Sequence, residues 1–131
     1  LAEGKIQAVC SDHQPHDRDA KLASFSDAEP GISGLETLLP LGLKLVDEKL
    51  IELATLIASL SSGPASLLGI NSGTLSIGSD ADICIFDPEA DCLVDASKLL
   101  SRGHNTPFNH WPLKGRVTNT IHAGRIVYSA D

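Results

Sequence analysis

Residues 1–33 combine one short apolar run with a long polar stretch. Residues 5–11 are β-prone, and the Asp/His/Pro-rich stretch that follows cannot continue a strand. Residues 17–33 are polar and carry Pro30 and Gly31 near their end, which is typical of a long functional loop. We therefore expect a strand that delivers a polar loop.

A helix is predicted to begin at Ser33. Ser33 and Glu36 have the spacing of a capping box, in which the hydroxyl and the carboxylate satisfy each other's free backbone N–H groups. Pro40 and Gly42 are expected to kink or loosen this helix. Its apolar stripe consists of Leu35, Leu38, Leu39, Leu43 and Val46.

Two further helices are predicted before residue 70. Residues 50–60 have a wide apolar face at helical spacing. The next helix begins at Pro64, which suits a first helical turn, and ends at Gly69. The pattern then changes from helical to strand-like, so we place a boundary near Asn71 and Ser72.

Strand-like patterns dominate the rest of the chain. The runs are residues 73–78, 81–86, 116–122 and 125–128. Asp87-Pro88 is expected to end the second run, and Ala123-Gly124 predicts a hairpin between the last two. Residues 1–71 are thus expected to close an α/β unit, and residues 72–131 to form a small β module.

Composition and charge exclude several classes of function. The chain has 131 residues, 42% of them hydrophobic and 21% charged, as in an ordinary globular protein with one core. Seventeen acidic residues against ten basic ones give a net charge of -7, and no Lys/Arg cluster is present, which argues against nucleic acid as a partner. Apolar runs are shorter than the roughly 18 residues of a membrane helix, so we expect no membrane partner and a cytoplasmic location. Cys10, Cys84 and Cys92 are too scattered for a disulfide framework and are expected to be reduced and buried.

The densest polar cluster is residues 11–16, Ser-Asp-His-Gln-Pro-His, directly after the first predicted strand. Parallel α/β folds place their active sites at such strand ends. Asp12 and His16 could supply a carboxylate for a metal or a proton and an imidazole for a ligand. On spacing alone, the signal is weak and favours an Asp/His turn cap over a catalytic site.

Three sequence motifs resemble those of one enzyme family. Residues 11–16, residues 30–37 (Pro-Gly-Ile-Ser-Gly-Leu-Glu-Thr) and residues 105–108 (Asn-Thr-Pro-Phe) are similar to the C-terminal part of dihydroorotases, which are related to hydantoinases and allantoinases. Residues 73–87 and the closing hairpin resemble the β-sandwich tail of the amidohydrolase superfamily.

This resemblance implies an α/β fold: the C-terminal end of a (β/α)8 TIM-type barrel followed by a small β-sandwich module. The implied activity is the zinc-dependent, reversible cyclisation of N-carbamoyl-L-aspartate to L-dihydroorotate in pyrimidine biosynthesis. Asp12 then corresponds to a zinc ligand that is also the catalytic proton carrier. His16 corresponds to the residue that holds the substrate carboxylate, and Pro30 and Gly31 to backbone contacts with the ring amide.

The resemblance also implies missing parts. A barrel of this type has about 250 residues, and the family's other zinc ligands and its substrate-binding Arg would precede Leu1. Because the chain also contains no Met, we expect a piece of a longer protein that is inactive and free of zinc on its own. Its expected partners are the missing N-terminal barrel segment, a second copy in a homodimer and, under the scaffolding alternative below, aspartate transcarbamoylase. The imidazoles expected to have surface or packing roles are those of His13, His104, His110 and His122.

Two alternatives stay open. One is a catalytically inactive dihydroorotase-like subunit that scaffolds aspartate transcarbamoylase, which Asp12 and His16 weigh against without excluding. The other is a hydantoinase or allantoinase relative, for which a residue other than His16 is expected at that position.

Overall fold

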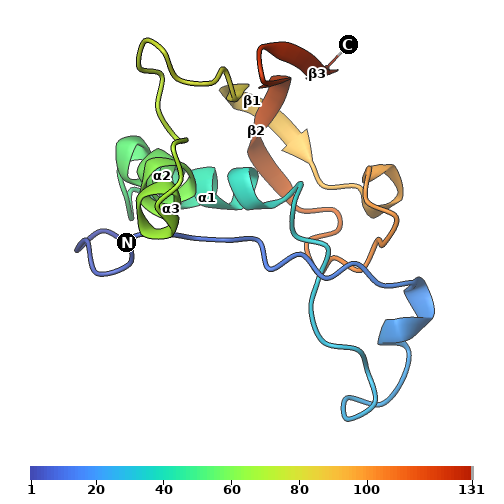
Figure 1. Ribbon diagram of the computed structural model, residues 1–131. Helices are drawn as coiled ribbons and strands as arrows, with labels where there is room; N and C mark the ends of the chain where they lie inside the picture. The colour runs from blue at the N-terminus through green and yellow to red at the C-terminus, as the bar shows by residue number, and fades with distance from the viewer. Residues whose placement is uncertain (131) are drawn as a thin grey trace.

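The computed structural model describes residues 1–130, apart from the side chain of Arg18. The helical elements in this range are η1 (Arg18–Lys21), α1 (Leu38–Asp47), α2 (Leu53–Leu60), α3 (Ser62–Leu68) and η2 (Ala96–Lys98), where η marks a 3-10 turn. The strands β1 (Ile83–Leu93), β2 (Pro112–His122) and β3 (Arg125–Ser129) form an antiparallel sheet in that order. Figure 1 shows the helices gathered together, the sheet rising beside α1, and the loop around η1 projecting away from both.

The first helix begins later than the capping box predicts. α1 starts at Leu38, with Thr37 as its N-cap and no side-chain cap. Ser33 and Glu36 instead use their side chains to bind residues 100–105. Pro40 lies in the first turn of α1, where its missing N–H removes no helical hydrogen bond, so no kink is required.

The second and third helices occur where they were predicted. α2 lies within residues 50–60, and α3 ends at Gly69 as expected, although it begins two residues before Pro64. None of the helices in residues 1–130 is both long and apolar enough to cross a lipid bilayer.

One small apolar core joins the helices to the sheet. α1 packs against both α2 and β2. The buried apolar side chains are Leu43, Leu56, Ala65, Val94 and Leu113. Because α1 and β2 are in contact, the two predicted parts, residues 1–71 and 72–131, share this core; the domain boundary between them stays a prediction.

Two predicted strands are absent from the described part of the chain. Residues 6–11 have no regular structure, and an isolated parallel bridge joins His13 to Ile32. Residues 73–78 form a loop that leaves Leu75 and Ile77 exposed. A strand requires a neighbour to take its backbone hydrogen bonds, and within residues 1–130 neither run has one. Both strand predictions are therefore wrong for this chain by itself.

The cysteine prediction was half wrong. The thiols are free, as expected, but Cys10 and Cys84 are exposed and Cys92 is half-buried. Cys10 lies in the unpaired run that was expected to be a covered strand, and Cys84 lies on β1, an edge strand of the sheet.

β1 continues through Asp87-Pro88, where the sequence predicted an end. Asp87 pairs with Arg116 and Asp91 with Lys114, so three residues of β1 lie opposite one residue of β2. This bulge accommodates Pro88, which cannot donate to the ladder.

The predicted hairpin is confirmed. Ala123 and Gly124 connect β2 to β3 with φ values of 48° and 74°, as in a type I′ turn. Asp82, the residue before β1, fixes this turn, because its Oδ1 accepts the Ala123 N–H at 2.8 Å and lies 2.9 Å from His122 Nδ1. His122 thus has a surface role, as predicted.

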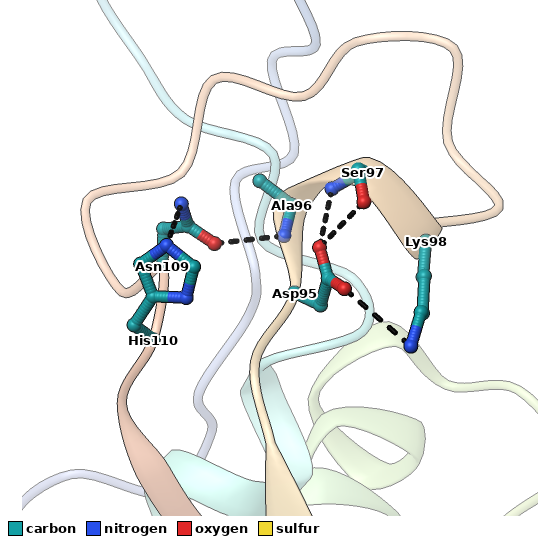
Figure 2. A network of polar contacts seen from close by, with 6 residues as sticks. All are labelled: Asp95, Ala96, Ser97, Lys98, Asn109 and His110. Atoms are coloured by element: carbon teal, nitrogen blue, oxygen red, sulfur yellow. Dashed lines mark hydrogen bonds and ion pairs between the residues drawn. The ribbon is translucent and has the colours of Figure 1, made fainter.

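The segment between β1 and β2, residues 94–111, is called the connecting loop below. Its two ends are held together, since Ala96 donates its N–H to Asn109 Oδ1 at 2.9 Å (Figure 2). Asp95 accepts the N–H and the hydroxyl of Ser97, and these hydrogen bonds, aided by Lys98, hold the pKa of the Asp95 carboxyl below its usual range. Beyond these ends, residues 100–105 make their own hydrogen bonds to Ser33 and Glu36.

Candidate functional site

Three segments far apart in the sequence meet in what we call the site cluster: residues 12–16, 30–34 and 101–105. Gln14 donates its backbone N–H to the Ile32 carbonyl at 2.8 Å. The connecting loop joins them, since Ser33 donates its N–H to the carbonyl of Asn105 at 3.1 Å. The cluster is held together by backbone and side-chain hydrogen bonds.

Asp12 lies at the exposed edge of the cluster. Its backbone has a φ of 41°, a left-handed conformation that Asp adopts more readily than most residues. The side-chain partner of its carboxylate is Gln14, whose Nε2 donates to Oδ2 at 3.1 Å. An exposed carboxylate with one such bond keeps acceptor positions for a metal ion or a proton.

His13 is used within the protein. Gly34 donates its N–H to His13 Nδ1 at 3.1 Å, so the ring proton is on Nε2, which lies 3.3 Å from Ser101 Oγ. Both ring nitrogens are engaged, which agrees with the predicted packing role.

His16 and Pro30 are in direct contact. His16 Nε2 lies 3.0 Å from the Pro30 carbonyl oxygen, and since a carbonyl only accepts, Nε2 carries the proton. This hydrogen bond leaves Nδ1 of His16 for a ligand. The half-buried ring therefore lies beside the loop that supplies the other predicted substrate contacts.

Position 31 requires glycine because the segment around it lies very close to residues 12–16. Its φ is 87°, and a Cβ there would lie 2.6 Å from Gln14 Cδ. A side chain at residue 31 would overlap the side chain of Gln14, so glycine allows the backbone of residues 30–32 to lie directly against residues 12–16.

The sequence analysis missed the residue that joins these segments. Asn105 Oδ1 accepts hydrogen bonds from the His16 N–H and the Ser33 hydroxyl, each at 2.8 Å. Its Nδ2 donates to the carbonyls of Gln14 and Gly31 at 3.0 and 3.3 Å. Asn105 was noted only as part of a family phrase. A polar Asn-Thr pair before Pro107 signals a loop, but no local pattern reveals partners so distant in the chain.

An open groove of about 640 Å³ lies beside the cluster. Ile32 and Asn105 line it together with Lys21 and His104. Asp12 and His16 do not line this groove, so it is not centred on the predicted carboxylate.

The residues of this chain do not fit a zinc site on their own. Within residues 1–130, no three His, Cys, Asp or Glu side chains lie close enough together to hold a metal ion. A catalytic zinc takes three protein ligands and a water, and Asp12 would supply one.

The sequence pattern of the Amidohydrolase family matches residues 1–127. The chain belongs to the amidohydrolase family. Its similarity to particular members extends over nearly its whole length. It is 45% identical to a dihydroorotase of Geobacter sp. (strain M21) over 99% of the chain and 31% of that protein. It is 48% identical to a dihydroorotase-like protein of Pseudomonas putida over 100% of the chain and 31% of that protein. The resemblance to dihydroorotases is thus confirmed.

The fold is also that of an amidohydrolase segment. The solved structure of L-hydantoinase (dihydropyrimidinase) from Arthrobacter aurescens superimposes with a TM-score of 0.89 at 35% identity. The match covers 98% of this chain and 30% of the hydantoinase. The chain therefore spans about a third of the length of the amidohydrolases that it matches.

Proposed function

We propose that the protein to which these residues belong is a dihydroorotase, which interconverts N-carbamoyl-L-aspartate and L-dihydroorotate in pyrimidine biosynthesis. The observation that carries this proposal is the 45% identity to a protein named dihydroorotase over 99% of the chain, which includes the whole site cluster. In this proposal the chain contributes Asp12, His16, Pro30 and Gly31 to the active site.

Each proposed role has support in the local geometry. Asp12 is the proposed proton acceptor for the attacking water, and its exposed carboxylate has acceptor positions free. His16 is the proposed contact for the substrate carboxylate, through the Nδ1 that its bond to Pro30 leaves open and that would have to carry a second ring proton to donate to a carboxylate. The carbonyls of Pro30 and Gly31 accept hydrogen bonds from His16 and Asn105, and each keeps a second lone pair for an N–H of the ring amide. Zinc is proposed as the metal of the whole protein, with Asp12 as one ligand and the others outside this chain.

The proposed architecture places residues 1–71 at the end of a (β/α)8 barrel and residues 72–131 in a β-sandwich. The unpaired run at residues 6–11 supports the first part, because barrel strands have neighbours on both sides. An apolar groove of about 360 Å³, lined by Val9, Leu38, Leu41 and Leu56 among others, also supports it. We further propose a cytoplasmic homodimer, as the family resemblance implies.

Replacement of Asp12 tests the proposed chemistry. In the complete protein, Asp12→Asn keeps the shape of the side chain but removes the proton acceptor, so turnover of dihydroorotate should fall by about a hundredfold or more. Asp27→Asn is the matched control, because Asp27 is an exposed carboxylate of the loop that accepts a hydrogen bond from Ser24. The measurement is steady-state turnover at equal zinc content. Near-normal turnover of zinc-loaded Asp12→Asn protein would remove Asp12 from the mechanism.

A second candidate is a dihydroorotase-like subunit without the activity, which scaffolds aspartate transcarbamoylase. The observation that favours it is the 48% identity to the Pseudomonas putida protein named dihydroorotase-like, which is as high as the identity to the Geobacter dihydroorotase. Turnover of dihydroorotate by the complete wild-type protein separates the two candidates. The same assay with hydantoin as substrate tests the hydantoinase alternative.

A further inference from the structure

The side chain of Asn105 fills a space between the two polar segments of the site. On one side its Oδ1 accepts the N–H of His16 at 2.8 Å. On the other its Nδ2 donates to the carbonyl of Gly31 at 3.3 Å, and also to that of Gln14 at 3.0 Å. A single carboxamide thus connects two of the proposed substrate contacts.

The orientation of this carboxamide is fixed by its partners. The His16 N–H can only donate, so it must face Oδ1, and the two carbonyls can only accept, so they must face Nδ2. Rotation of the amide by half a turn would place like groups together on both sides. Asp at this position would set a carboxylate oxygen against the two carbonyls.

The backbone of the connecting loop is held in place independently of this side chain. Glu36 Oε1 accepts the N–H groups of Leu100 and Ser101 at 2.8 and 3.2 Å. The carbonyl of Asn105, a backbone group, accepts the Ser33 N–H. Gly103 lies so close to His16 that a Cβ there would be 2.5 Å from His16 N. Removal of the carboxamide should therefore leave the loop docked.

We propose that Asn105 is a positioning residue of the active site, whose carboxamide holds the His16 backbone at a fixed place relative to Gly31. This role rests on the proposed function, because His16 and Gly31 are its proposed substrate contacts. Asn105 acts on substrate binding through these two residues.

Steady-state kinetics of the complete protein test this role. Because the positioned groups bind substrate, Asn105→Ala should raise the KM for dihydroorotate about tenfold while kcat falls less than threefold. Asn105→Asp should raise KM at least as much, since it retains Oδ1 but loses both N–H donors. Asn109→Ala is the matched control, because Asn109 binds Ala96 and His110 at the other end of the same loop (Figure 2) and should leave KM unchanged. An unchanged KM in both Asn105 variants would overturn the proposal.

Amide hydrogen exchange, read residue by residue without substrate, separates positioning from a general structural role. In Asn105→Ala the His16 amide loses its acceptor and should exchange about tenfold faster. The Ser33 amide keeps its acceptor, the Asn105 backbone carbonyl, and should exchange as before. Equal acceleration at both amides, or none at either, would contradict the positioning role. If the wild-type protein does not turn over dihydroorotate, the proposed function fails, and this exchange pattern alone decides the role of Asn105.

Discussion

The apolar core and the site cluster are held together by different forces. In the core, α1, α2 and β2 bury leucine side chains against one another. In the cluster, loop segments are joined by hydrogen bonds, and those that involve the connecting loop link residues as far as 91 positions apart in the chain. Asp12 in the cluster and Glu36, next to the cluster in the chain, are exposed, whereas Leu56 in the core is 2% exposed. We infer that global stability depends mainly on the core, and that the geometry of the site depends mainly on the hydrogen bonds.

A cavity in the core should have the largest effect on stability. Leu56→Ala removes a buried side chain and should lower the free energy of unfolding by about 2–5 kcal/mol. Leu67→Ala is the control, because Leu67 is 60% exposed in this chain and its loss should cost less than about 1 kcal/mol. Urea denaturation of the complete protein measures both. Equal losses in the two variants would show that Leu56 does not mark the stabilising region.

Loss of a hydrogen-bond acceptor beside the cluster should have a smaller effect on stability. Glu36→Ala removes the acceptor for the Leu100 and Ser101 N–H groups, and the net loss should be about 1 kcal/mol because these exposed groups can bind water instead. Glu36→Gln keeps an Oε1 acceptor and should lose less. A loss as large as that of Leu56→Ala, again by urea denaturation, would remove the distinction between the two regions.

The smallest effect is expected at the hairpin turn, outside both regions. The Ala123 N–H, with a lesser contribution from His122, holds the pKa of the Asp82 carboxyl below its ordinary value. A carboxyl with a lower pKa in the folded state stabilises the fold above its unfolded pKa of about 4, and this contribution is lost as the pH falls from there through the folded pKa. Asp82→Asn should therefore flatten the dependence of melting temperature on pH between 5 and 3, while Asp80→Asn should not. Identical pH profiles for the two variants would show that Asp82 does not contribute.

Patterns formed by residues close together in the sequence predicted much of the core region and also the hairpin. Helical spacing located α2, Gly69 marked the end of α3, and Ala123-Gly124 identified the hairpin. These features depend on residues a few positions apart, so the local sequence contains the information. Residues 5–11 and 73–78 were wrongly predicted as strands because their propensity is correct but their pairing partners are absent from residues 1–130.

The site was predicted in part, and for a different reason. Family phrases identified Asp12, His16, Pro30 and Gly31, and the structure brings His16 and Pro30 into contact; their catalytic roles stay predictions. Ser33 was misread as a helix cap because Ser and Glu three residues apart have the same appearance whether they bind their own helix or a distant loop. The role of Asn105 could not be read at all, since its partners are remote in sequence.

The length of chain between His16 and Asn105 bears on how the protein is made. They are 89 residues apart, and β1 must be synthesised before the connecting loop. Helices α1 to α3 are joined by local contacts and can pack early, whereas contacts between distant residues form late. Until Asn105 has been synthesised, residues 12–16 lack the carboxamide that holds them. The geometry of the site cluster can therefore be completed only after the helices and β1 have been made.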